Sequence, residues 1–134
     1  MRSDVILNKV MIIKRCIERV NQVYAGNPEN LTDYTMQDSI ILNIQRACEA
    51  AIDLAMHIIA ERGLGLPQSS RQAFDLLCQS DIIDQDLAKK LKAMVGFRNI
   101  AVHDYQAVNL KIVQKIIEEH MVDFNAFANE ILRL

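Results

Sequence analysis

The chain has 134 residues, enough for one hydrophobic core and too few for two domains of ordinary size. Apolar residues make up 51% of it and aromatic residues only 5%, with four Gly and two Pro, a composition that favours helices over sheets. The formal net charge of −2 excludes a global basic field of the kind that binds nucleic acid non-specifically, so any contact with a nucleic acid must be local.

The cysteines and the apolar runs favour a cytoplasmic protein. Cys16, Cys48 and Cys78 are odd in number, widely spaced and lack metal-like pairing, so they are interpreted as buried, reduced thiols. Charged residues such as Asp4 and Lys9 interrupt the first apolar stretch, which predicts no secretory signal. No apolar run reaches the length that a membrane span needs, so no membrane contact is expected.

Five helical segments are predicted, and the first two are long. The first begins at Ser3 as N-cap and ends at Gly26, and the second opens at a capping box of Thr35 with Asp38 and runs to Gly63. The apolar seam of the first helix has steps of three and four: Ile6, Val10, Ile13, Ile17, Val20 and Tyr24.

The second helix is apolar on most of its circumference, which indicates burial on several sides. Two arrangements explain it, a central position in the bundle or a second chain packed against it, and we favour the second chain on the chemical grounds given below. One polar stripe remains: Arg46, Glu49, Asp53, His57 and Glu61. A single helix supplies too few ligands for a metal, so the stripe is interpreted as a solvated or interface face, and no metal site is predicted.

Three shorter helices follow. The third starts at Ser69 or Ser70, with Gln72 in capping-box register to Ser69, the fourth begins after Asp84, and Asn109 caps the fifth. The buried stripe of the fifth helix consists of Val113, Ile116, Ile117, Met121, Phe124, Phe127, Ala128 and Ile131. The chain therefore predicts an all-α, antiparallel up-down bundle of about five helices.

The end of the fourth helix carries the residues best suited to chemistry. Arg98 falls four residues after Met94, where the apolar seam calls for Leu, and His103 and Tyr105 follow within a turn or short loop. A fixed cation, a group that titrates near neutrality and a phenol together suit the handling of a phosphate. The structural alternative is an Arg that caps the helix and a His and Tyr that only satisfy backbone groups.

Two further features of the fourth helix leave alternatives open. Lys89, Lys90 and Lys92 form either its solvated face or a guide that draws a polyanion toward Arg98. Gly96 costs about 1 kcal/mol relative to Ala inside a helix, so it marks either a close approach of another group or a kink.

Arg98, Asn99, His103 and Tyr105 form the pattern R-N-x3-H-x-Y, and the chain thereby resembles the HEPN-domain toxins of HepT–MntA toxin–antitoxin pairs. The resemblance extends to the length, the long early helices, the motif at the end of the fourth helix and the closing amphipathic helix. It implies a single HEPN-like domain over residues 1–134 and a metal-independent endoribonuclease without a cofactor.

Cleavage of RNA without a metal needs one group to deprotonate the 2′-hydroxyl and another to protonate the leaving 5′-oxygen. Each chain supplies one motif histidine, so a two-fold homodimer with both motifs in one cleft would complete the pair, as the resemblance also implies. Arg98 is predicted as phosphate clamp, His103 as acid–base catalyst and Asn99 as an orienting group. His57 and His120 lie on long helices without an adjacent cation and are interpreted as structural.

Tyr105 has two candidate roles. It could stack or hydrogen-bond at the RNA site, or, as the resemblance implies, accept AMP from a minimal nucleotidyltransferase antitoxin of the MntA type. The added charge and bulk would block the RNA phosphate.

Two other functions compete with the toxin hypothesis: a non-catalytic helical partner that presents nucleotide or substrate to a nucleotidyltransferase, and a dimeric bundle without an active site. The complete set of Arg98, His103 and Tyr105 favours the enzyme. The RNA target, tRNA or mRNA, stays open.

Overall fold

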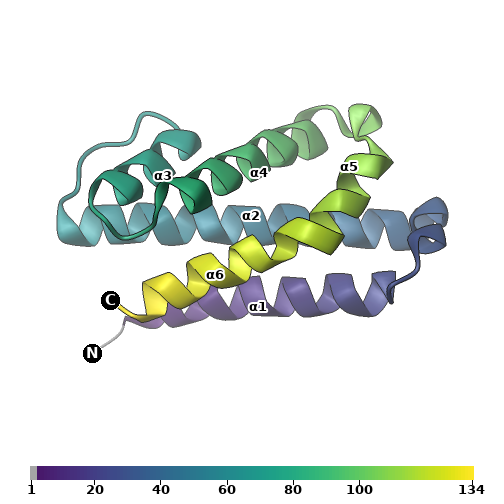
Figure 1. Cartoon of the computed structure of the whole chain (residues 1–134), viewed down its shortest axis with the longest axis horizontal. Coiled ribbons are helices and arrows are strands. Elements are labelled where there is room, and N and C mark those ends of the chain that lie inside the picture. Colours follow the sequence, from purple (N-terminus) through teal and green to yellow (C-terminus); the bar gives the residue numbers. More distant parts are fainter. Residues whose placement is uncertain (1–2) are drawn as a thin grey trace.

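The computed structural model describes residues 3–134, and its regular elements in that range are helices. Helices α1 and α2 form an antiparallel pair, α4 lies along the other side of α2, and the closing α6 crosses over the bundle toward the N-terminal end (Figure 1). The α-helices are α1 (Asp4–Tyr24), α2 (Tyr34–Arg62), α3 (Ser70–Gln79), α4 (Gln85–His103), α5 (Leu110–Lys115) and α6 (Met121–Leu132). The predicted all-α bundle is confirmed.

Most of the predicted helix starts are confirmed by their caps. The side-chain oxygens of Ser3, Ser69, Asp84 and Asn109 each accept a hydrogen bond from a backbone N–H two or three residues ahead. Each bond satisfies one of the N–H groups that a helix start leaves unpaired. At the other end of α2, Gly63 adopts a left-handed conformation with φ of 64°, which residues with a Cβ rarely adopt, and ends the helix as predicted.

Two predicted helix boundaries were wrong. Asp33, not Thr35, caps α2, because its Oδ1 accepts a hydrogen bond from the N–H of Met36 at 2.9 Å. At the end of α1, Ala25 takes the left-handed cap position with φ of 52°, one residue before the predicted stop at Gly26. The first error matters for function, because it frees the carboxylate of Asp38 from the capping role that the sequence suggested.

Helix α2 occupies the centre of the bundle. It contacts α1, α3, α4 and α6, and these helices cover nearly all of its apolar circumference. Of its large aliphatic side chains, Met36 and Leu42 are the exposed ones. The central position thus accounts for the burial within one chain, and the second chain, which we favoured on chemical grounds, stays a prediction. The prediction of a dimer now depends on the chemical argument alone.

The predicted fifth helix is continuous but contains one wide turn. Ile116–His120 form a π-helical segment between α5 and α6, in which the N–H of Met121 donates to the carbonyl of Ile116, five residues back. The extra residue lets Ile116 and Met121 face the same core, where Phe124 and Phe127 follow. The rings of Phe127 and Phe74 meet edge to face, with centroids 5.6 Å apart, and join this helix to α3.

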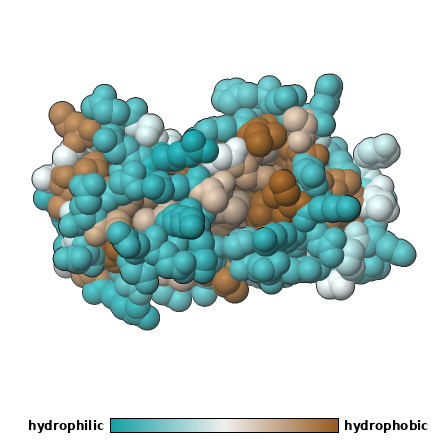
Figure 2. Space-filling model, turned by 45° about the horizontal axis from the view of Figure 1, so that its top comes forward, coloured by the Kyte–Doolittle hydropathy of each residue, from teal (hydrophilic) through white to brown (hydrophobic). Residues whose placement is uncertain are grey.

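The face of the molecule drawn in Figure 2 is mostly polar. Figure 2 shows a largely hydrophilic face, with apolar side chains gathered on the right, the side on which Figure 1 places α5. Cys16 and Cys48 are buried, whereas Cys78, predicted to be buried, is only half-buried, and all three thiols are free. Within residues 3–134, no helix combines the length and the apolarity needed to cross a membrane.

Candidate active site at the end of helix α4

The motif lies where α4 stops and the chain turns. His103 is the last helical residue, and the N–H of Asp104 closes the helix on the carbonyl of Ile100 at 2.8 Å. Tyr105 then opens a short 3₁₀ helix, Tyr105–Ala107. Both His103 and Tyr105 are exposed, so an imidazole and a phenol stand at one end of the bundle, with the histidine in a last turn where a positive charge is favoured.

Arg98 is half-buried on the inner side of α4 and lacks an acidic partner among the described residues. Its Nη2 donates to the Oγ of Ser70 at 3.5 Å, a long and weak hydrogen bond, and its buried Nε has no partner within residues 3–134. A buried polar group left unsatisfied costs about 1–3 kcal/mol. The guanidinium therefore retains most of its capacity for an anion.

The positive charge of Arg98 also acts on α2. Burial raises the pKa of the Cys48 thiol to about 12, while the charge of Arg98 opposes the rise and that of Glu49 adds to it. Arg98 therefore lies within electrostatic reach of the middle of α2 and bonds to the start of α3. A helical side chain leans toward the N-terminus of its own helix, which takes this guanidinium away from the exposed end of α4.

Tyr105 has a partner that sequence reasoning missed. Its hydroxyl donates a short hydrogen bond to Oδ1 of Asp38, 67 residues earlier in the chain. Partial burial, the hydrogen bond and the negative charge of Asp38, in that order, raise the pKa of Tyr105 to about 12. The signal in the sequence was a carboxylate in the first turns of α2, but its spacing to Thr35 suggested a cap instead.

One chain does not bring the motif residues together. Five residues separate Arg98 from His103, which turns their side chains about 140° apart around the helix. No hydrogen bond joins them in the described chain, and Asn99 is half-buried between the two faces. The structure thus places Arg98 with Ser70 and Tyr105 with Asp38, while it leaves His103 at the surface.

Gly96 lies against the end of an exposed, flexible side chain, which favours close approach, one of the two alternatives that its position left open, without requiring glycine. A Cβ built on it would lie 2.8 Å from Nη2 of Arg71, which is under van der Waals contact. Arg71 reaches across α4 and donates from Nε to the carbonyl of Lys92 at 3.4 Å. The guanidinium group of Arg71 therefore links the start of α3 to the Lys92–Gly96 side of α4.

Two of the three lysines in the run on α4, and both histidines outside the motif, have protein partners. Lys90 pairs with Asp86 at 2.9 Å and Lys92 with Asp75 at 2.8 Å, which leaves Lys89 as the lysine of that run without a carboxylate in residues 3–134. This pairing favours the solvated face over the polyanion guide. His120 lies 2.9 Å from the buried carboxylate of Asp123.

The polar stripe on α2, apart from Arg46, likewise contacts neighbouring side chains. Asp53 pairs with Lys9 at 3.1 Å, and Nε2 of His57 lies 3.2 Å from Glu61 and 3.3 Å from Ser3. The amide of Gln45 donates to Glu49 at 2.8 Å. These contacts agree with the interpretation of His57 as structural and of the stripe as a solvated face.

The comparisons with known proteins identify the family. Residues 13–131 match the model of HepT-like ribonucleases. The mRNA nuclease HepT of Shewanella oneidensis MR-1 is 53% identical over 129 residues, 96% of this chain and 97% of that protein.

Solved structures agree in fold along the whole chain. A crystal structure of a toxin–antitoxin with AMP-PNP has a TM-score of 0.95 and 51% identity, and covers 98% of this chain and 100% of that one. The tri-AMPylated Shewanella oneidensis HEPN toxin in complex with MNT antitoxin also has a TM-score of 0.95 and 51% identity, covering 99% and 100%. The predictions of a HEPN fold, of a ribonuclease and of a toxin are confirmed, and the chain belongs to the HepT-like ribonuclease family.

Proposed function

We propose that this chain is the toxin of a two-component system in the cytoplasm and cleaves RNA without a metal, with Arg98 and His103 as its catalytic residues. The observation that carries this proposal is the end of α4, where a guanidinium without a carboxylate partner in residues 3–134 lies five residues before an exposed histidine. The Shewanella relative is an mRNA nuclease, so messenger RNA is the first substrate to test.

The reaction follows from the chemistry of these side chains. The 2′-oxygen of RNA forms a bond to phosphorus, and the bond from phosphorus to the 5′-oxygen breaks. One His103 takes the proton of the 2′-hydroxyl, and a second protonates the leaving 5′-oxygen. Arg98 stabilises the charge on the phosphate by bidentate hydrogen bonds, and Asn99 orients it. The products are a 2′,3′-cyclic phosphate and a 5′-hydroxyl.

The need for two histidines supports a homodimer. In one chain Arg98 and His103 point in directions about 140° apart, so neither the acid–base pair nor the clamp is complete. A two-fold axis near the end of α4 would place the partner's His103 opposite His103 and bring both clamps to one cleft. The proposed dimer therefore completes the site.

The related solved structures support a specific form of control. In one of them a HEPN toxin carries three AMP groups and is bound to an MNT antitoxin. For this chain we take the partner to be a minimal nucleotidyltransferase and the modified residue to be Tyr105, whose hydroxyl is at the surface and bonds to Asp38. The phenol oxygen attacks the α-phosphorus of ATP, pyrophosphate leaves, and the proton passes to the Asp38 carboxylate.

The test of the nuclease is direct. Purified protein is incubated with total RNA in EDTA, and the ends of the fragments are determined. We expect cleavage in the presence of the chelator and 2′,3′-cyclic phosphate ends. Activity that disappears with EDTA, or fragments with 5′-phosphate ends, would instead indicate water activated by a metal and contradict the proposed mechanism.

A further inference from the structure

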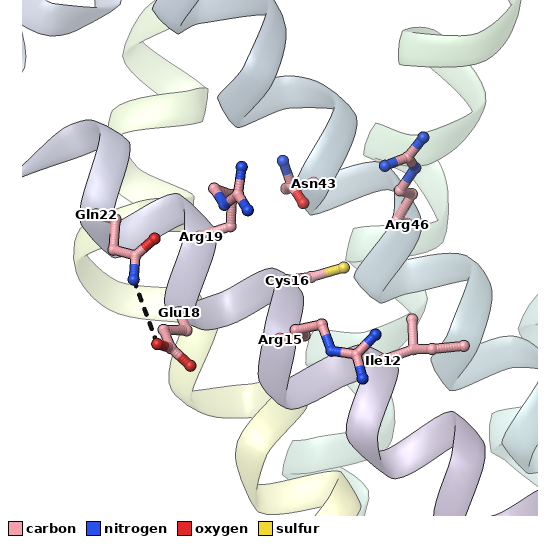
Figure 3. Close-up of a pocket in the computed structure, with 8 residues that line it drawn as sticks. All are labelled: Ile12, Arg15, Cys16, Glu18, Arg19, Gln22, Asn43 and Arg46. Atoms are coloured by element: carbon pink, nitrogen blue, oxygen red, sulfur yellow. Dashed lines mark hydrogen bonds between the residues drawn. The ribbon is translucent and has the colours of Figure 1, made fainter.

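A second group of cations lies away from the motif, between α1 and α2. Arg15 and Arg19 of α1 and Arg46 of α2, here the α1–α2 arginine cluster, surround a hollow of about 380 Å³. Figure 3 shows the Cys16 thiol in the middle of this hollow, with Arg19 and Asn43 on one side and Arg15 on the other. The three arginines are exposed, while Cys16 is buried at the base.

These arginines lack protein partners, as do Arg62, Lys89, Lys111 and Lys115 among the described cations, but the three arginines gather around one hollow. Within residues 3–134, none of the three forms an ion pair or a hydrogen bond through its side chain, and the nearby Glu18 accepts from Gln22 at 3.2 Å instead. By contrast, four cations elsewhere pair with carboxylates: Lys9, Lys90, Lys92 and Arg133. In a chain of net charge −2, three unpaired guanidinium groups around one hollow form a local positive field that an anion would neutralise.

The side chains around the hollow favour a phosphate backbone over a free nucleotide. No aromatic side chain lines the hollow, so it offers no ring on which a base could stack. Each guanidinium can bind phosphate oxygens in a bidentate manner. Arg15 and Arg19 are one turn apart, about 6 Å along α1, so they can contact successive phosphates of one strand. Asn43 donates to the carbonyl of Ser39 at 2.8 Å and keeps its Oδ1 free for a ribose hydroxyl.

The position of the hollow fits an RNA that also reaches the motif. Arg46 and Asp38 are both exposed on α2 and are two turns apart, about 12 Å along the helix. Asp38 holds Tyr105 beside the end of α4. A strand bound in the hollow can therefore pass over α2 toward His103.

We propose that the α1–α2 arginine cluster binds the phosphate backbone of single-stranded RNA outside the cleavage site and so holds the substrate of the proposed nuclease. The proposal takes its ligand from the proposed function, but the site itself involves none of the motif residues. It therefore predicts that removing the three arginines lowers the affinity for RNA without changing the rate of the cleavage step.

The experiment replaces all three arginines of the cluster by Gln. A control replaces three exposed cations elsewhere, Arg62→Gln, Lys111→Gln and Arg133→Gln, and so makes the same change in net charge. Binding of a 2′-O-methyl RNA 20-mer, which has no 2′-hydroxyl to attack, is measured by fluorescence anisotropy over a series of KCl concentrations. Circular dichroism and size-exclusion chromatography check the fold of each variant.

We expect the cluster variant to bind at least tenfold more weakly than the control. The slope of log K against log salt should become shallower by about 2, because each phosphate contact on a single strand contributes about 0.7. Cleavage at saturating RNA should stay unchanged while KM rises. The proposal would be overturned by an equal loss of RNA affinity in the two triple variants or by an unchanged salt slope. It would also be overturned if the cluster variant lost binding to the antitoxin but kept its affinity for RNA. If the natural chain binds RNA through the cluster but cuts none, the proposed nuclease fails and this inference stands.

Discussion

Replacing Asp38 by Asn tests how Tyr105 would become a nucleophile. With a pKa of about 12, the Tyr105 hydroxyl is ionised in about one molecule in 10⁵ at pH 7, against about one in 10³ for an unperturbed phenol. Attack by a preformed phenolate is therefore handicapped by the environment that the structure provides. A carboxylate in hydrogen-bond contact offers the other route, because general-base catalysis typically contributes 10²–10⁴ in rate.

The two routes predict opposite signs for Asp38→Asn. The amide has the same size and can still accept the hydrogen bond of Tyr105, but it cannot take the proton. Removing the charge of Asp38 also lowers the pKa of Tyr105 toward its usual value and raises the phenolate population. That gain is below about 100-fold, because burial, the largest cause of the shift, remains. If Asp38 is the base, adenylylation should slow by at least tenfold, and if the phenolate attacks, it should accelerate.

The assay is a time course of intact mass, with the nucleotidyltransferase partner and ATP, in which AMP units are counted. Asp33→Asn is the matched control, since it makes the same change one turn earlier in α2, where Asn caps as well as Asp. Cleavage of RNA by the Asp38→Asn variant should be retained. Adenylylation at or above the rate of the natural chain would refute the role of Asp38 as base.

Three further predictions concern the motif and the core. His103→Ala and Arg98→Ala should each abolish RNA cleavage in a gel assay. Circular dichroism should still show a helical protein, since neither side chain fills the core. Cleavage by the His103→Ala variant would contradict the acid–base role of His103. Tyr105→Phe keeps the ring but lacks the acceptor oxygen, so it should cut RNA and gain no AMP by mass spectrometry, and AMP found on this variant would place the modification elsewhere. Phe124→Ala empties a fully buried position and should lower the free energy of unfolding by about 3–5 kcal/mol, which lowers Tm by on the order of 10 °C. The control Val122→Ala, at a side chain that is 65% exposed, should change Tm by a few degrees at most.

Local chemistry in the sequence predicted much of this fold. The caps at Ser3, Ser69, Asp84 and Asn109 follow from side-chain oxygens before apolar stripes, and the structure confirms each of them. The end of α4 was predicted less well, because the sequence placed it near Arg98 with His103 in a turn or short loop, whereas the helix continues to His103. The caps depend on neighbours within one or two helical turns.

The parts that were missed depend on contacts between distant segments. The bond between Tyr105 and Asp38 joins residues 67 positions apart, and only the packing of α4 on α2 brings them together. The central place of α2 has the same origin: an apolar circumference indicates burial but does not say whether the cover comes from the same chain. The wide turn at Ile116–His120 runs against local preference and brings Ile116 and Ile117 into the core, whereas the left-handed Ala25 is an exposed cap whose exact position the local pattern did not fix.

The positions of Arg98 and Tyr105 constrain how an AMP group could silence the enzyme. Arg98 bonds to Ser70 at the start of α3, whereas Tyr105 bonds to Asp38 near the start of α2, so two different helices hold the two side chains. A single phosphate on Tyr105 would therefore be attached on the α2 side of the motif, close in sequence to His103, while the guanidinium of the same chain is turned toward α3. It would act by blocking the approach of RNA to the imidazole. Neutralisation of Arg98 itself requires either a longer chain of AMP units or, in a dimer, the modified tyrosine of the other protomer.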